Sequence, residues 1–143
     1  CHVHEKFSVE AIIKLKQEHP DAVVMAHLEC KAPVLAVADV KGSTATMLHY
    51  AQEHPEIKEY IIATEAGILH ELERNCPNVI FYPVPPEVSE GGVGCSCNEC
   101  EYMKMNSLKK IYNSLKFGWP TVEVAPEIAK DAVKPIEKML SLS

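Results

Sequence analysis

Short apolar runs rich in Val and Ile alternate along this chain with longer segments that have helical periodicity. The runs at 22–26, 60–63 and 79–82 predict buried strands, and residues 121–124 predict a fourth strand. Ser8 is placed to cap the first helix. Because strands and helices that alternate in sequence build a parallel sheet with helices on both faces, the chain is predicted to have an α/β fold.

The C-terminal part of the chain predicts a loop followed by two helices. Residues 83–99 are rich in Pro and Gly, and a loop of this length is typical of a functional lid or ligand loop. The helical pattern is strong from 102 to 115, and a second helix should begin at Pro126. Pro135 should kink or break that second helix, because proline has no backbone N–H to donate.

Composition argues against several classes of protein. The 143 residues carry a formal net charge of -6 and no basic stripe, so we do not expect nucleic-acid binding. No apolar run approaches the roughly 18 residues that a membrane span requires. The chain lacks a signal-peptide pattern and begins at Cys1, so we expect a further segment to precede it. A chain that is 47% hydrophobic can form a core without disulfides, which favours a reducing, cytoplasmic setting for its six cysteines.

Cys95, Cys97 and Cys100 lie within six positions of one another at the end of the predicted loop. Cysteines this close together bind a soft metal or exchange disulfides. A redox dithiol of Cys97 and Cys100 is chemically reasonable. A zinc ion would need another ligand, for which the candidates are Cys1, His2 and His4. One hypothesis is therefore a zinc- or thiol-based binding module that uses Cys95, Cys97 and Cys100 without catalysis.

Polar residues follow the first two predicted strands. His27 and Glu29 come after the first strand, and Thr64 and Glu65 come after the second. Ligands of parallel sheets bind beyond the carboxyl ends of the strands, so we expect these residues at one edge of the sheet. His27 and Glu29 would share a face and could move protons near neutral pH. The alternative is a histidine bonded at the sheet edge beside a solvated glutamate.

The helix predicted after Gly42 begins with two hydroxyl residues, Ser43 and Thr44. Free backbone amides and the positive end of the helix dipole make such a start a site for phosphate or carboxylate. Ordinary N-capping explains the same residues and is the commoner reason for them. Thr64 and Glu65 are open to the same two explanations, again with capping favoured.

Motifs throughout the chain occur in the order and spacing of one enzyme family: Cys1-x-Val3-His4-Glu5-x-Phe7, His27-x-Glu29-Cys30, Gly42-Ser43-Thr44, Ile61-Ile62-Ala63-Thr64-Glu65-x-Gly67-Ile68 and Cys97-Asn98-x-Cys100-x-Tyr102-Met103. In these motifs the chain resembles quinolinate synthase. The resemblance covers essentially the whole chain, but only the C-terminal half of the family's chain.

The resemblance implies an enzyme of de novo NAD biosynthesis. It would condense iminoaspartate with dihydroxyacetone phosphate to give quinolinate, phosphate and water, with a functional link to L-aspartate oxidase. The implied fold has three similar αβα domains around a central site, each with a short parallel sheet. This chain would hold one complete unit and part of another. Residues 1–30 would end the preceding domain, and residues 31–143 would form the αβα domain that carries the cysteine loop.

The resemblance also implies a [4Fe–4S] cluster held by three cysteines. By position, Cys1 and Cys100 match two of its ligands, and the third would lie in the N-terminal half of the polypeptide. Cys30 matches a position that is not a ligand. A disulfide between Cys97 and Cys100 could compete with cluster binding as a redox switch.

Five further residues match the family's active site. His27 and Glu29 match catalytic residues, whose imidazole and carboxylate would move protons. Ser43 and Thr44 match contacts to substrate anions. His4, close to the ligand Cys1, is expected to contact substrate as well.

The chain departs from the family's pattern at three points. Leu28 stands where Pro is usual, which should loosen the strand end that holds His27 and Glu29. Lys41 stands where the family usually has an aromatic or large apolar residue. The N-terminal half is absent, so we expect that the 143-residue chain alone has no catalytic activity.

Overall fold

The computed structural model describes residues 1–86 and 98–142. The chain forms two compact units, Cys1–Lys104 and Met105–Ser143. The boundary expected at residue 30 concerns the domains of a longer polypeptide and stays a prediction.

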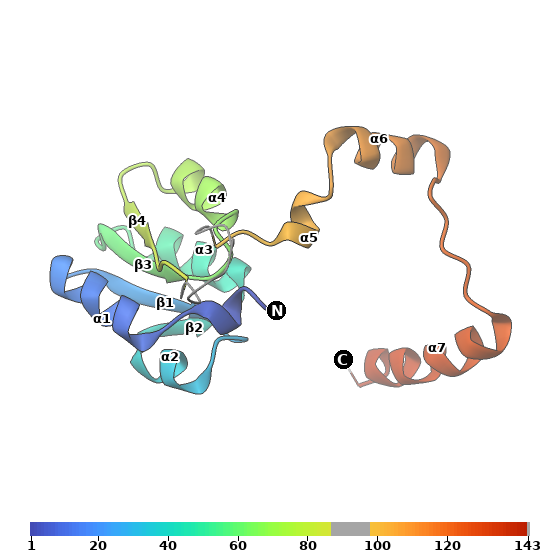
Figure 1. Cartoon of the computed structure of the whole chain (residues 1–143), viewed down its shortest axis with the longest axis horizontal. Helices are drawn as coiled ribbons and strands as arrows, with labels where there is room; N and C mark the ends of the chain where they lie inside the picture. Colours follow the sequence, from blue (N-terminus) through green and yellow to red (C-terminus); the bar gives the residue numbers. More distant parts are fainter. Residues whose placement is uncertain (87–97, 143) are drawn as a thin grey trace, which may run out of the picture. The chain divides into compact units, whose positions relative to one another are not determined.

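The first unit is built on a four-stranded sheet in which all the paired strands are parallel (Figure 1). The strand order is β2-β1-β3-β4, with bounds β1 Val23–His27, β2 Val40–Gly42, β3 Glu59–Ala63 and β4 Ile80–Pro83. The predicted α/β fold with a parallel sheet is therefore confirmed. The sequence pattern does not predict β2, because three residues are too few to show a periodicity.

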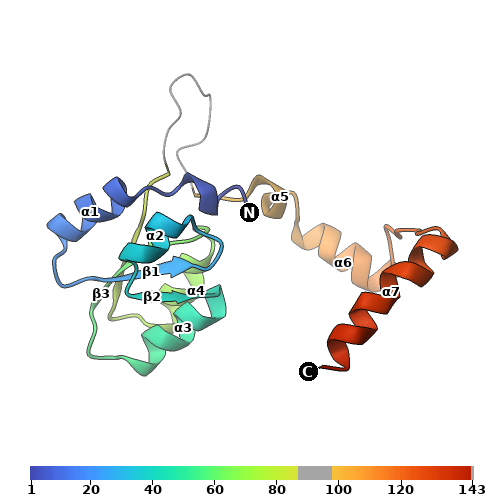
Figure 2. The same ribbon diagram turned by 90° about the horizontal axis from the view of Figure 1, so that it is seen from below.

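Helices cover both faces of this sheet. Their bounds are η1 His4–Lys6, α1 Val9–Glu18, α2 Ala32–Val37, α3 Thr44–Glu53 and α4 Ile68–Asn75. The short α5 (Glu101–Lys104) follows Cys100 and has no buried residue. Figure 2 shows α1 and α2 on one side of β1 and β2, and α3 on the other side. Ser8 and Ser43 cap α1 and α3, because each side-chain oxygen accepts a hydrogen bond from the backbone N–H three residues later.

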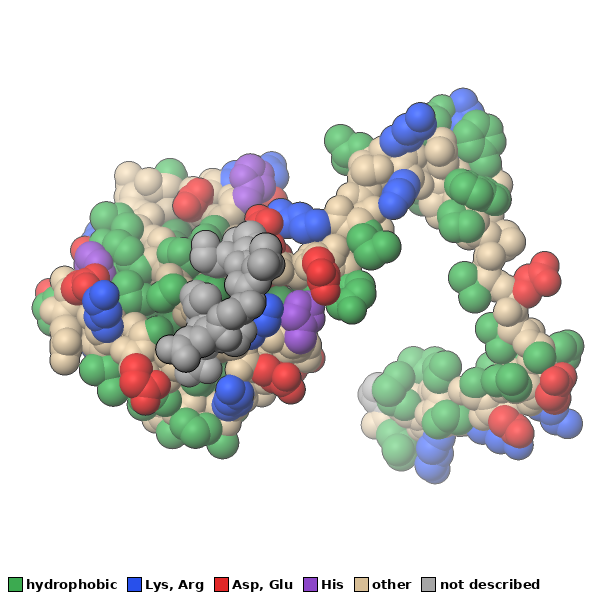
Figure 3. Space-filling model, in the orientation of Figure 1, with side chains coloured by type: hydrophobic (Ala, Val, Ile, Leu, Met, Phe, Trp, Pro, Cys, Tyr) green, Lys and Arg blue, Asp and Glu red, His purple; other side chains and the backbone are tan. Residues whose placement is uncertain are grey.

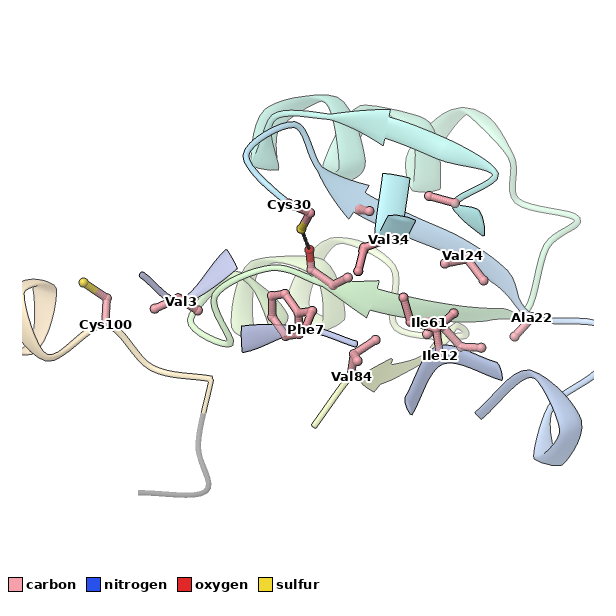
Figure 4. Close-up of a cluster of buried hydrophobic side chains, with 13 residues drawn as sticks. Val3, Phe7, Ile12, Ala22, Val24, Cys30, Val34, Ile61, Val84 and Cys100 are labelled. Atoms are coloured by element: carbon pink, nitrogen blue, oxygen red, sulfur yellow. Dashed lines mark hydrogen bonds between the residues drawn. The ribbon is translucent and has the colours of Figure 1, made fainter. Parts of the chain in front are cut away.

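Alternate residues of each strand point to opposite faces, so the sheet separates two clusters of buried side chains. The first core cluster lies against α1 and α2 (Figure 4) and includes Val3, Phe7, Ile12, Val24, Cys30, Val34, Ile61, Ala63 and Cys100. The second core cluster lies against α3 and α4 and includes Met25, Met47, Tyr60, Ile62, Leu72, Cys76 and Phe81. Burying each large apolar side chain stabilises the fold by about 1.5–3 kcal/mol.

The second unit contains α6 (Leu108–Phe117) and α7 (Pro126–Leu140). Both helices carry exposed apolar side chains (Figure 3), among them Leu108, Ile111, Leu115, Ile128 and Met139. Across the described ranges, no helix is both long enough and apolar enough to cross a membrane.

Two expectations for the C-terminal part are wrong, and the break allowed for at Pro135 does not occur. The helix predicted from 102 to 115 is divided, because the Ser107 hydroxyl accepts a hydrogen bond from Lys110 N–H at 3.3 Å and begins a new helix. Residues 121–124 form no strand, and none of the described strands pairs with them. In addition, α7 continues unbroken through Pro135, where the missing N–H costs one hydrogen bond at an exposed position.

Tyr60 provides a test of the second core cluster. Its side chain is fully buried, and its hydroxyl has no hydrogen-bond partner among the described residues. We expect Tyr60→Phe to leave the free energy of unfolding unchanged at neutral pH or to raise it by up to about 1 kcal/mol, because no hydrogen bond is lost.

The advantage of Tyr60→Phe should grow at alkaline pH. Burial raises the pKa of Tyr60 from 10.0 to about 12, so the folded chain holds this proton more tightly than the unfolded chain. The wild-type chain therefore loses stability as the pH rises between these two values, and the variant does not. Urea denaturation at neutral and alkaline pH measures both effects, with Tyr112→Phe on exposed α6 as the control. A clear loss of stability at neutral pH would contradict the prediction.

Candidate functional site

His4 connects three separate segments of the chain. Its buried ring places Nδ1 3.0 Å from Oε2 of Glu29 and Nε2 3.0 Å from Oγ1 of Thr64. An ionised carboxylate can only accept a hydrogen bond, so in the neutral ring Nδ1–H donates to Glu29. The other nitrogen, Nε2, then accepts from the Thr64 hydroxyl. Both ring nitrogens are thus used within the protein.

The parallel pairing of β1 with β3 explains why these segments meet. Ala26 lies opposite Ala63, so the next residues along the two strands, His27 and Thr64, leave the sheet at the same edge. Phe7 follows η1 and is buried in the first core cluster, where it anchors η1 to the sheet.

The His27 ring stacks on the His4 ring, with centroids 4.1 Å apart and an interplanar angle of 7°. Its Nδ1 accepts a hydrogen bond from the backbone N–H of Glu29 at 3.2 Å, so neutral His27 carries its proton on Nε2. Burial, followed by the charge of His4, lowers the pKa of His27 below its usual 6.5. At pH 7 His27 is therefore neutral and offers Nε2–H as a donor.

Glu29 is exposed and lies beside both imidazoles. The hydrogen bond from His4 is the main reason why the pKa of Glu29 lies below its usual value. Glu29 is therefore ionised at neutral pH, which makes it a proton acceptor next to a proton donor.

β2 brings a helix N-terminus to the same edge of the sheet. Its last residue, Gly42, lies opposite His27, and Leu28 N–H donates to the Gly42 carbonyl at 3.3 Å. This hydrogen bond ties Leu28 to the end of β2, which opposes the expected loosening of the strand end that holds His27 and Glu29. Ser43 and Thr44 follow directly and begin α3. Ser43 caps this helix as expected, and the role of both hydroxyls toward substrate stays a prediction.

The two expected cluster ligands come from segments that lie side by side. Cys1 is exposed and Cys100 is buried. Val3 and Cys100 both belong to the first core cluster and lie at one end of it in Figure 4. The ring of His2 meets the ring of Tyr102 edge-on, with centroids 5.8 Å apart. The fold therefore brings the segments around residues 1 and 100 together.

Cys30 lies near the site but is not a candidate ligand. The buried Cys30 thiol donates to the Ala63 carbonyl at 3.5 Å, and burial raises its pKa to about 11. This thiol stays protonated, as suits a residue outside the ligand set. Cys95 and Cys97 lie outside the described residues, so the redox pair with Cys100 and the zinc- or thiol-based module stay predictions.

Two donor sets could hold a metal. A thiol, an imidazole nitrogen and a carboxylate oxygen, from Cys1, His4 and Glu29, lie within 4.8 Å of one another. A single ion bound there would break the hydrogen bond between His4 and Glu29. Cys1 and Cys100 offer thiols, the usual ligands of an iron–sulfur cluster, and neither thiol takes part in the hydrogen bond between His4 and Glu29. The cluster itself stays a prediction.

Thr64 has a larger part in the site than its sequence pattern indicates. The pattern favours capping, but the Thr64 hydroxyl is buried and bonds to His4. The next residue, Glu65, accepts a hydrogen bond from Gly67 N–H at 2.7 Å, but the N-cap residue of α4 is Gly67 and no side chain caps this helix. The available signal for Thr64 was its place directly after a strand that pairs with the strand of His27.

Comparison with known proteins places the chain among named relatives. A family model described as quinolinate synthetase A protein matches residues 1–141. The curated quinolinate synthase of Prochlorococcus marinus (strain MIT 9303) is 44% identical over 142 residues, which cover 99% of this chain and 41% of that protein. Those of Synechococcus sp. (strain ATCC 27144 / PCC 6301 / SAUG 1402/1) and Chloroherpeton thalassium (strain ATCC 35110 / GB-78) are 39% and 42% identical, over 100% of this chain and 43% of each protein. The chain thus spans about two fifths of the length of these relatives.

The stack of His4 on His27 can be tested by titration. We expect His27 to titrate below pH 6.5 and its pKa to rise in His4→Gln, because the variant removes both the covering ring and its charge. Between the two pKa values the unfolded chain binds more protons at His27 than the folded chain, so stability should fall as the pH drops from 6.5. Imidazole NMR signals measure the pKa. His49→Gln, at an exposed position of α3, is the control, and an unchanged His27 pKa in His4→Gln would contradict the prediction.

Proposed function

The chain belongs to the quinolinate synthetase A protein family, and we propose that it supplies the proton-transfer residues and two cluster ligands of a quinolinate synthase. In the proposed reaction, iminoaspartate and dihydroxyacetone phosphate condense to quinolinate with loss of phosphate and water. The rest of the enzyme, including the third cluster ligand, would come from the part of the relatives' length that this chain does not span.

One observation carries the proposal. His4, the pair His27 and Glu29, and Thr64 come from three segments and meet at the carboxyl edge of the sheet, in a chain that matches the family from residue 1 to residue 141. Their chemistry supports a condensation that loses water, because such a reaction needs a proton acceptor and a donor side by side.

The roles of His27 and Glu29 follow from their protonation states. The ionised Glu29 carboxylate would take a proton from the carbon or nitrogen that forms the new bond. His27 would donate a hydrogen bond from Nε2 to an oxygen that gains negative charge, as a neutral imidazole can. His4 bonds to both Glu29 and Thr64, so we assign it the task of aligning the carboxylate beside the substrate.

Ser43 and Thr44 would bind the acidic groups of the substrates. They begin α3, whose N-terminal amides and dipole attract phosphate and carboxylate. When bound by Cys1, Cys100 and a third cysteine, a [4Fe–4S] cluster would supply a Lewis-acidic iron that polarises substrate oxygen and nitrogen. We place the enzyme in the cytoplasm, in functional connection with L-aspartate oxidase.

The ligand assignment can be tested in a full-length polypeptide that contains this chain. We expect Cys1→Ser to abolish both the iron content and the activity after anaerobic purification, because the cluster loses one of three thiolates. Cys30→Ser should keep the iron, since the Cys30 thiol donates to a backbone carbonyl. Iron and sulfide analysis measures both variants. A Cys30→Ser protein without iron, or a wild-type protein that is colourless and holds one zinc ion, would refute the assignment.

The role of His27 can be tested in the same polypeptide. We expect His27→Gln to lower kcat by about 100-fold, because the donor to the developing negative charge is displaced. His49→Gln, at an exposed position of α3, should keep wild-type activity. Steady-state kinetics at saturating substrate, with iron content measured on the same samples, separates this loss from loss of the cluster. Full activity in His27→Gln would remove His27 from the mechanism.

A further inference from the structure

One carboxylate joins the end of β3 to the segment that carries Cys100. Oε2 of Glu65 accepts a hydrogen bond from Gly67 N–H at 2.7 Å, and Oε1 accepts one from Cys100 N–H at 3.1 Å. Glu65 and Cys100 are 35 residues apart in the chain. Each oxygen of this side chain therefore holds a different part of the backbone.

Two further hydrogen bonds fasten the same segment. Ala66 N–H donates to the Asn98 carbonyl at 2.8 Å, and the Asn98 side-chain amide donates to the Val84 carbonyl. Asn98 and Cys100 are both buried. The short stretch from 98 to 100 is thus attached to the turn after β3 and to the end of β4, close to the first core cluster.

Gly67 leaves the space that the Glu65 carboxylate needs. A Cβ atom at position 67 would lie 2.6 Å from Oε2 of Glu65, which is closer than such contacts allow. The backbone of Gly67 is right-handed helical, with φ -61° and ψ -23°, so alanine would fit the backbone itself. An alanine here would displace the carboxylate and little else.

We infer that Glu65 is a positioning residue for Cys100, and that Gly67 permits it. The contacts of Glu65 stand on their own, whereas the group that Cys100 would bind is taken from the proposed function. Two N–H donors meet this side chain, and only a carboxylate offers an acceptor to both. A glutamine would turn its own N–H₂ toward one of the donors. The charge on the carboxylate also strengthens both bonds relative to neutral ones.

Thiol alkylation of the 143-residue chain tests this role. Cys100 and Cys76 are 7% and 8% exposed, so Cys76 serves as an internal reference of equal burial. We expect Glu65→Gln and Gly67→Ala each to raise the alkylation rate of Cys100 by about tenfold, because local opening becomes easier when a bond to a charged group is lost. The rate at Cys76 should stay unchanged. Peptide mass spectrometry after timed exposure to iodoacetamide measures both rates.

Amide hydrogen exchange separates positioning from general loss of structure. In Glu65→Gln, exchange should accelerate at Cys100 N–H and Gly67 N–H, while Ile62 N–H within β3 keeps its wild-type rate. Glu73→Gln removes the same charge from an exposed position of α4 and should change none of these rates. Wild-type alkylation and exchange at Cys100 in Glu65→Gln and Gly67→Ala would overturn the inference, as would equal acceleration at Ile62.

Iron loading of the full-length polypeptide connects this inference to the proposed function. We expect Glu65→Gln to bind less iron than the wild type, with the exposed Glu73→Gln as the control. If the wild-type polypeptide binds no iron, the proposed function fails, whereas the alkylation and exchange results still decide the role of Glu65. If the wild type and Glu65→Gln bind equal iron, the positioning role is refuted and the proposed function stands.

Discussion

Backbone hydrogen bonds between β1 and β3 determine which residues can meet at the site. Because the strands are parallel and Ala26 lies opposite Ala63, His27 and Thr64 leave the sheet together, and η1 can place one histidine between them. A shift of one residue in this pairing would exchange the side chains that the strands present to the two core clusters and would move Thr64 away from His4. The apolar residues of both strands are buried on both faces of the sheet, so their packing supports the chemistry as well as the fold.

His4 gives the site a fixed internal geometry. Its two ring nitrogens bond to Glu29 and Thr64, and its face stacks on His27, so a single buried side chain orients three others. The same contacts set their charges: Glu29 stays ionised because His4 donates to it, and His27 stays neutral because His4 covers it. A proton acceptor and a neutral donor are thereby kept side by side at neutral pH.

The sequence predicted the parts of the fold that depend on local pattern. Periodicity identified three of the strands, and the rule for the ends of parallel strands placed His27, Glu29 and Thr64 at one edge. The sequence pattern could not identify β2, which is too short to show a periodicity. It also missed the break in the helix at Ser107, where an N-cap outweighs a continuous apolar stripe. The sequence offered His4 only as a candidate zinc ligand, and its place in the substrate site entered through the resemblance to quinolinate synthase, because its contacts depend on tertiary structure and not on spacing.

The division of the core by the sheet has a consequence for how such a protein can evolve. His4, Cys30 and Cys100 lie in or beside the first core cluster, whereas the second cluster, against α3 and α4, includes none of the residues assigned to proton transfer or ligation. Sequence drift in the second cluster would be limited only by volume and apolarity, so homologues can exchange methionine, leucine and aromatic residues there. The first core cluster can accept fewer substitutions, because a repacked side chain there would also move a ligand or an imidazole.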